Sequence, residues 1–249
     1  MMKAVIKSGL KRLGWYDRAS ALWIRLEPLL VNGSRALTGK NQRLTAQYFA
    51  AHEKPALHIG CGDNELGGWL NTELCPRGGQ IFLDATRRFP FDAGMFSFVY
   101  SEHMIEHISA QDAEVMLKEC FRVMSPHGVI RIVTPNLAFL TGLVDPSPNP
   151  ALASYIRYNL ATYKVPGPVA DGVAVFNHFM RAWGHQFIHT EASLKAVMVL
   201  AGFENVSACP LNVSTYPELA GLAKLDRMPD GILEMESFVL EGTKPARRA

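Results

Sequence analysis

No stretch of 18 consecutive apolar residues occurs in the sequence, so no membrane-spanning helix is expected. The N-terminus also lacks a compact apolar core followed by a small-residue cleavage site, which argues against a secretory signal peptide. Only four cysteines occur, and none forms a Cys-x-x-Cys pair. A disulfide framework or a zinc ribbon is therefore not expected, and the chain is predicted to work in the reducing cytoplasm.

Excess charge of one sign is also scarce, since the net charge is only +2, but it is unevenly distributed. Residues 1–43 carry nine Lys and Arg against Asp17 and Glu27, so the remaining residues are net acidic. Two hypotheses remain open for this basic segment. It can contact a membrane surface or an acidic partner, or it can form a solvated helical collar on the domain. Nucleic acid is not expected as a substrate, because the acidic remainder lacks a basic footprint for phosphates.

Short apolar runs alternate with helical patterns from Pro55 onward, which predicts an α/β fold with a parallel sheet. Ser109 is predicted to cap a helix, with Asp112 three residues later and apolar residues at helical spacing up to Met124. The segment 125–128, Ser-Pro-His-Gly, should end this helix and turn into the next strand. The predicted strands in this half are 56–60, 69–74, 80–84, 96–101 and 129–134.

The second half is predicted to carry a lid. Residues 145–189 are rich in proline and aromatic residues, and such a long irregular segment favours a substrate-binding lid over a linker. Thr190 should then cap a last helix closed by Gly202, and strands near 204–211 and 236–241 should finish the sheet. The predicted organisation is a helical N-terminal extension over 1–50, with breaks near 32–34 and 38–39, and a catalytic domain over 51–249. The lid insertion covers 137–189.

One stretch, "LHIGCGDNELGGWLNTEL" at 57–74, points to a nucleotide-like ligand. Gly60 and Gly62 follow a predicted strand, and glycine lets a ligand lie directly against the backbone. Dinucleotide folds place a third glycine where this chain has Glu65, and a carboxylate there would repel a pyrophosphate. Glu73 can bind both ribose hydroxyls, and Asp84 can hold an adenine amino group. The pattern predicts an adenosine site without a phosphate cradle, which suits the cationic S-adenosylmethionine.

The segments "LHIGCG", "NTEL", "LDAT", "FSFVYSEHMIEHI" and "CFRVMSPHGVIRIVTPN", with a late "AGF", resemble those of class I S-adenosylmethionine-dependent methyltransferases. The resemblance covers residues 55–140 and, more loosely, 201–206. It implies a Rossmann-like sheet of seven strands, mostly parallel, with the last strand antiparallel. The short gap between Gly62 and Glu73 departs from the family, because it leaves little room for a first helix. The resemblance implies these cofactor-binding residues: Gly60, Gly62, Asn64, Glu73, Asp84, Ala85 and Ser101.

The segment "SEHMIEH" at 101–107 supplies the candidate catalytic residues. A hydroxyl acceptor must lose a proton, and His103 is the leading candidate for the base, with His185 second. On a helix, His103, Glu106 and His107 would share a face that can bind a divalent metal. The segment also resembles Glu-x-x-Glu-His in metal-dependent O-methyltransferases, except that His103 replaces a glutamate. A further metal ligand could come from His178, His185 or His189, whereas simple packing is the alternative.

The favoured function is O-methylation of a saccharide or other small molecule, because aromatic side chains suit sugar faces and histidine suits a hydroxyl nucleophile. N-methylation of a metabolite or peptide is the second hypothesis. The Asn/Asp-Pro-Pro-aromatic signature of enzymes acting on nucleic-acid amino groups is absent at 101–103. A third hypothesis is a non-catalytic partner subunit that binds S-adenosylmethionine. The sequence leaves the oligomeric state open.

Overall fold

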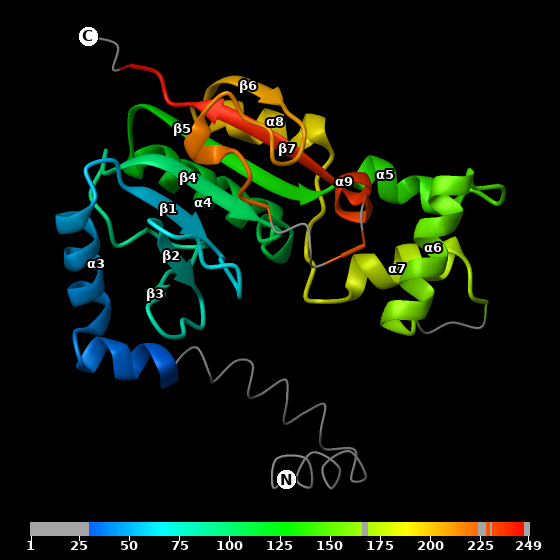
Figure 1. Cartoon of the computed structure of the whole chain (residues 1–249), viewed down its shortest axis with the longest axis horizontal. Coiled ribbons are helices and arrows are strands. Elements are labelled where there is room, and N and C mark those ends of the chain that lie inside the picture. The colour runs from blue at the N-terminus through cyan, green and yellow to red at the C-terminus, as the bar shows by residue number, and fades with distance from the viewer. Residues whose placement is uncertain (1–29, 166–168, 224–227, 230, 247–249) are drawn as a thin grey trace, which may run out of the picture.

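The computed structural model describes residues 30–165, 169–223, 228–229 and 231–246 (Figure 1). Residues 30–37 are helical, and helix α3 (Lys40–Ala51) follows a turn that ends at Gly39, where φ is +60°. The predicted break near 38–39 is confirmed, whereas the predicted break near 32–34 is wrong. Asn32 and Arg35 bond to backbone carbonyls of the main domain, so tertiary contacts hold a helix that Gly33 disfavours. Most of the basic segment, residues 1–29, lies outside the described residues.

The described strands form one seven-stranded sheet in the order β3-β2-β1-β4-β5-β7-β6. Strands β1 to β5 pair in parallel, and β7 is antiparallel to both of its neighbours. The predicted α/β Rossmann-like fold with an antiparallel last strand is therefore confirmed. The strand bounds are β1 (Ala56–Ile59), β2 (Leu70–Glu73), β3 (Ile81–Phe82), β4 (Phe96–Glu102), β5 (Met124–Pro135), β6 (Glu204–Ala208) and β7 (Ser237–Thr243).

Helices α4 (Ala110–Val123) and α8 (Glu191–Leu200) pack on one face of the sheet (Figure 1). Both N-caps are as predicted, because Ser109 accepts from Asp112 N–H and Thr190 accepts from Ser193 N–H. The predicted turn at 125–128 is a bulge within β5, where Met124 pairs with Phe96 and Val129 pairs with Phe98. Alternate strand residues point to this face, so apolar side chains of the sheet and the two helices form the main core.

Loops cover much of the opposite face. Residues 60–69, which connect β1 to β2, contain no helix, as the short gap before Glu73 predicts. Leu66 and Trp69, from the loop after β1, pack with the segment around Leu211 and Leu222 on this face. The buried Arg131 secures that segment by donating hydrogen bonds to the carbonyl oxygens of residues 210 and 213, and it pairs with Glu241 across β5 and β7.

The insertion after β5 is helical rather than irregular, so that part of the prediction is wrong. Asn136, Asn149 and Asp171 each accept a backbone N–H at a helix start, which offsets the many prolines and turn residues. The helices have a hydrophobic core of their own and lie beyond the carboxyl ends of β4 and β5 (Figure 1). The elements are α5 (Leu137–Thr141), 3-10 helix η2 (Gly142–Val144), α6 (Pro150–Tyr163) and α7 (Gly172–Arg181), joined by α9 (Ile232–Glu236).

None of the helices in the described part of the chain combines the length and apolar character needed to cross a membrane. Its four cysteines are free thiols.

Candidate active site

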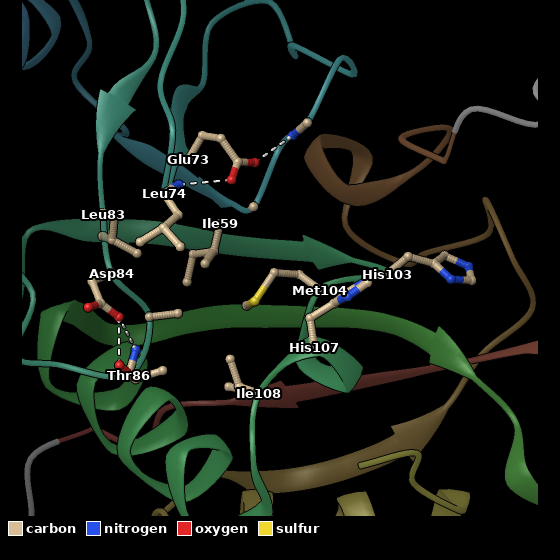
Figure 2. Close-up of a pocket in the computed structure, with 13 residues that line it drawn as sticks. Ile59, Glu73, Leu74, Leu83, Asp84, Thr86, His103, Met104, His107 and Ile108 are labelled. Atoms are coloured by element: carbon tan, nitrogen blue, oxygen red, sulfur yellow. Dashed lines mark hydrogen bonds between the residues drawn. The ribbon is translucent and has the colours of Figure 1, made fainter. Parts of the chain in front are cut away.

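A cavity of about 350 Å³ opens at the carboxyl ends of the central strands (Figure 2). Gly60 and Gly62 line it directly after β1, and both have positive φ, +65° and +53°. A side chain at Gly60 would collide with Met104, so glycine is required there for space as well as for conformation. The lining residues are Ile59, Gly60, Gly62, Glu73, Leu74, Leu83, Asp84, Ala85, Thr86, His103, Met104, His107 and Ile108.

Two carboxylates stand at successive strand ends along this cavity. Glu73 ends β2, and its oxygens accept hydrogen bonds from Gly62 N–H at 3.0 Å and Leu74 N–H at 2.8 Å (Figure 2). Asp84 follows β3 and accepts from the Thr86 hydroxyl at 2.6 Å. The cavity thus combines close backbone approach at the glycines with a carboxylate at each of two strand ends. These are the groups that the sequence predicts at the binding site of an adenosine-containing cofactor.

Two residues predicted for the cofactor site lie outside the lining of this cavity. Asn64 donates to Glu102 Oε2 and to the Leu222 carbonyl, each at 3.4 Å, so it braces the loop after β1. Ser101 is fully buried within β4. Cys61, between the two glycines, is buried, and burial with the nearby Glu73 raises the pKa of its thiol to about 12.

His103 is held in a left-handed backbone conformation, with φ +48°, directly after β4. Its N–H donates to the Val133 carbonyl at 2.9 Å. Its Nδ1 lies 3.2 Å from Glu106 Oε1, and its Nε2 lies 3.0 Å from the Ser237 hydroxyl oxygen. The predicted helix over 103–107 is therefore only a 3-10 turn, η1 (Ile105–His107), and His103 precedes it.

A second cavity of about 230 Å³ adjoins the first and lies between η1 and the helical insertion. His103 and His107 line both cavities. Asn159 and Glu236, neither of which was predicted as a site residue, are nearly fully buried here. Glu236 accepts a hydrogen bond from the Tyr155 hydroxyl. A carboxylate beside the last strand was the only available signal. The lining residues are His103, Glu106, His107, Asn159, Tyr163, Phe179, Trp183, His185, Met228 and Glu236.

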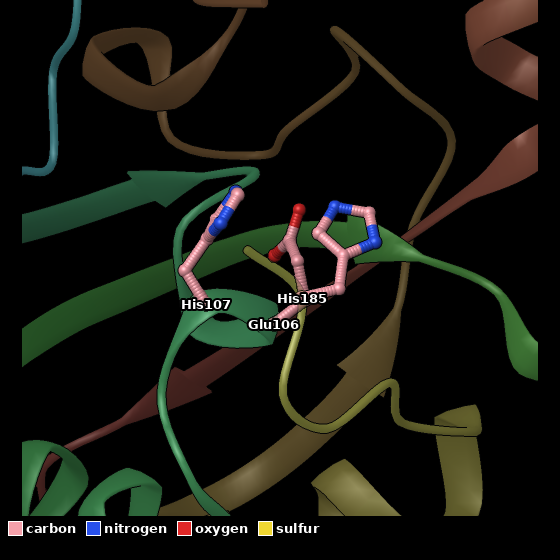
Figure 3. A group of neighbouring side chains, drawn as sticks. All are labelled: Glu106, His107 and His185. Atoms are coloured by element: carbon pink, nitrogen blue, oxygen red, sulfur yellow. The ribbon is translucent and has the colours of Figure 1, made fainter. Parts of the chain in front are cut away.

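Three neighbouring side chains that could bind a metal line the second cavity, and one of them, His107, also lines the first (Figure 3). Glu106, His107 and His185 have ligand atoms within 4.8 Å of one another. This set differs from the predicted His103, Glu106 and His107, because His103 precedes η1 and its Nε2 contacts Ser237, whereas the helical insertion supplies His185. His178 and His189 are not part of the cluster. His185 Nδ1 lies 2.7 Å from the Phe179 carbonyl, and burial lowers the pKa of its ring.

Glu106 is the most buried member of this cluster. Its Oε2 accepts from the Thr134 hydroxyl at 3.1 Å, whereas Oε1 receives no well-formed hydrogen bond in the described part of the chain. Burial alone would raise the pKa of this carboxyl, but the contact with His103 and the nearby His107 outweigh it and lower the pKa. The lowered pKa favours an ionised Glu106 carboxylate, with Oε1 next to His103 Nδ1 on the side of the second cavity.

Comparison with known proteins matches residues 69–132 to a family model described as a methyltransferase domain. The match contains Glu73, Asp84 and the segment 101–107, and the glycine turn lies just before it. No curated protein matches the sequence.

Among solved structures, a SAM-dependent methyltransferase from Archaeoglobus fulgidus is 16% identical, with 90% of this chain and 99% of that chain covered and a TM-score of 0.47. A Thermotoga maritima SAM-dependent methyltransferase described as a possible histamine N-methyltransferase is 17% identical, with 89% and 99% covered and a TM-score of 0.43. A Methanosarcina mazei SAM-dependent methyltransferase is 15% identical, with 79% and 95% covered and a TM-score of 0.43.

The family match and the architecture agree. The sheet has the seven strands and the antiparallel last strand that the sequence resemblance implies, and the structure adds that β7 lies between β5 and β6. Residues 69–132 thus match a methyltransferase-domain model, and they lie within a chain that has a Rossmann-like fold.

Proposed function

We propose that this chain transfers a methyl group from S-adenosylmethionine to a hydroxyl group of a small polar acceptor such as a saccharide. The observation that carries the proposal is the meeting of two cavities at His103 and His107. The cavity with the glycine turn, Glu73 and Asp84 suits the donor. The cavity under the helical insertion suits the acceptor, so the two reactants would face each other across the histidines, and much of the rate would come from this alignment.

His103 is the proposed general base. The Glu106 carboxylate beside Nδ1 favours the tautomer with a proton on Nδ1, which leaves Nε2 as the acceptor. Nε2 now faces the Ser237 hydroxyl, and an acceptor hydroxyl would take that place. The proton of the acceptor hydroxyl would move to His103 Nε2 while the acceptor oxygen would form the new bond to the methyl carbon and the carbon–sulfur bond would break. The products are a methyl ether, S-adenosylhomocysteine and an imidazolium stabilised by Glu106.

The lining of the second cavity supports a hydroxyl-rich acceptor. Tyr163, Phe179 and Trp183 provide flat apolar surfaces, and such surfaces suit the faces of sugar rings. Glu236 and Asn159 add buried hydrogen-bonding groups that can select an acceptor by its hydroxyl pattern. Two carboxylates in one cavity also suit a cationic amine, so N-methylation is the competing outcome of the assay below.

A divalent metal ion is part of the proposal at Glu106, His107 and His185. The fit rests on the chemistry of the ligand set, because the Glu106 carboxylate and two imidazoles have ligand atoms within 4.8 Å of one another. Carboxylate and imidazole ligands suit several divalent ions. When bound, such an ion would polarise an acceptor hydroxyl and lower its pKa.

A methyl-transfer assay with labelled S-adenosylmethionine against saccharides, other alcohols and amines tests the function. Glu73→Ala should weaken cofactor binding in calorimetry, and His103→Asn should lower kcat by roughly 10²- to 10⁴-fold while retaining cofactor binding. His127→Asn is the matched control, because His127 also has positive φ but is exposed and far from both cavities. Absence of cofactor binding in the wild type would refute the function, and methylation of amines alone would refute the hydroxyl acceptor.

The same assay separates metal assistance from base catalysis. We expect a chelator to reduce activity, a divalent ion to restore it, and His185→Asn to weaken the ion's effect. Full activity in chelator together with full activity of His107→Ala would exclude the metal and leave His103 as the acting group.

A further inference from the structure

The N-terminal extension contacts the loop between β2 and β3 at three backbone carbonyls. Arg35 is only 6% exposed, and its guanidinium donates to the Gln80 carbonyl at 2.6 Å and to the Pro76 carbonyl at 3.1 Å. Asn32 donates to the Leu74 carbonyl at 3.4 Å. Arg35 also donates to Asn41 Oδ1 at 3.2 Å, which ties the two helical segments together. Figure 1 shows this extension along the β3 edge of the sheet.

Gln80 extends these contacts to the cofactor cavity. Its side chain is 3% exposed, and its Nε2 donates to the Gly62 carbonyl at 2.8 Å and to Glu65 Oε1 at 3.0 Å. Its Oε1 accepts from Arg77 N–H at 2.8 Å, which fixes the orientation of the amide. The side chain is thus fully engaged, and it connects the β2–β3 loop to the glycine turn.

Gly62 is consequently held at both of its backbone polar groups by side chains. Its N–H donates to Glu73 at 3.0 Å, and its carbonyl accepts from Gln80. Residues 60–69, between β1 and β2, contain no helix, so helical hydrogen bonds are not available to order the glycine turn. Backbone hydrogen bonds from Cys61 N–H to the Thr72 carbonyl and from Asn64 N–H to the Cys61 carbonyl hold the start of the turn, whereas side chains hold Gly62 itself.

We propose that Gln80 is a positioning residue of the cofactor site and that Arg35, from the N-terminal extension, is its anchor. The effect on cofactor binding rests on the proposed function, whereas the ordering of the glycine turn does not. The extension is accordingly part of the cofactor site rather than a collar alone. Loss of Gln80 should free Gly62 and Glu73 to adopt other orientations, and the ligand would have to restore the correct one.

The kinetic test uses Gln80→Ala and Gln80→Glu. We expect KM and Kd for S-adenosylmethionine to rise about tenfold, because the three hydrogen bonds of a buried amide are lost, with kcat and the acceptor KM within about twofold of wild type. Gln80→Glu should be the more severe, because it places a second carboxylate against Glu65. Gln47→Glu makes the same charge change on an exposed face of α3 and should match wild type. A fall in kcat together with an equal rise in both KM values would indicate general damage to the fold and overturn the proposal.

Hydrogen exchange of the ligand-free protein tests the ordering without reference to activity. Amides of residues 60–66 should exchange faster in Gln80→Ala than in wild type. Arg35→Lys should show the same change more weakly, since one ammonium cannot reach both carbonyls, and Arg43→Ala at an exposed site should show none. Unchanged exchange in Gln80→Ala overturns this inference alone. Failure of wild type to bind S-adenosylmethionine overturns the proposed function and the effect of Gln80 on cofactor binding, but not the ordering of the glycine turn.

Discussion

Two residues of the second cavity adopt a backbone conformation that their side chains disfavour. His103 and Trp183 have φ of +48° and +55°, and neither is glycine, asparagine or aspartate. Such conformations cost of order 1–3 kcal/mol each and persist only where the surroundings hold them. His103 is held by the Val133 carbonyl, Glu106 and Ser237. The cost is consistent with a requirement to direct these two rings into the cavity.

His58 provides a prediction about acid stability. It is buried in β1, its Nδ1 contacts Asn71 Oδ1 at 3.1 Å, and burial lowers its pKa to about 4. Between pH 6.5 and 4 the His58 imidazole therefore stays neutral in the folded protein, whereas in the unfolded chain it takes up a proton. The free energy of unfolding should fall across this window, by up to about 3 kcal/mol from this residue, and the contribution is fully present above pH 6.5.

The measurement is urea unfolding of wild type and His58→Gln from pH 8 to pH 4. At pH 8 the difference between the two proteins reports lost packing alone. As the pH falls, that difference should shrink or reverse, because only the wild type carries the histidine penalty. Parallel pH curves for the two proteins would show that His58 is not responsible.

At the scale of elements, the pair of Arg131 on β5 and Glu241 on β7 predicts a large stability effect. Arg131 is 1% exposed and also bonds to the loop that covers this face of the sheet. Arg131→Met should reduce the free energy of unfolding by about 3–5 kcal/mol, because it leaves a buried carboxylate unpaired. Lys118→Met, which breaks an exposed pair with Glu114, should cost at most about 1 kcal/mol.

Denaturant unfolding of both variants checks this prediction, and the double variant Arg131→Met, Glu241→Met should recover part of the loss. An Arg131→Met protein within about 1 kcal/mol of wild type would mean that solvent reaches the pair.

The elements that local chemistry specifies could be predicted from the sequence. Ser109 and Thr190 cap helices where expected. The short gap before Glu73 correctly predicts that no helix lies between β1 and β2. The insertion after β5 could not be predicted as helical, since its prolines occur at helix starts as well as in loops, and only its own core decides between them.

The site, like the fold, could be predicted only where its residues carry a local sequence pattern. Cavity residues next to a strand end, such as Gly60, Glu73 and His103, carry a local pattern. Gln80, Asn159 and Glu236 do not, because their roles depend on segments that are distant in sequence. His185 was a candidate only through its residue type, and its place beside Glu106 follows from tertiary packing.

At the scale of the whole molecule, two bodies with separate cores contribute different halves of the site. The sheet and its flanking helices provide the first cavity, and the helical insertion provides one wall of the second. His103, His107 and the η1 turn lie where the two bodies meet. This arrangement predicts that substitutions in the helical insertion weaken acceptor binding and that substitutions in the β2–β3 loop weaken cofactor binding.

Trp183 tests this division. Its ring packs edge-on against Tyr163 and Phe179, and its side chain lines the second cavity without reaching the first. Trp183→Ala should raise the acceptor KM about tenfold through loss of an aromatic contact surface, with the cofactor Kd within about twofold of wild type. Trp183→Phe should restore part of the affinity. Steady-state kinetics and calorimetry on these variants and on Gln80→Ala should give opposite patterns. A cofactor Kd that rises with the acceptor KM in Trp183→Ala would mean that the two bodies act as one binding unit, and the assignment of one reactant to each cavity would fail.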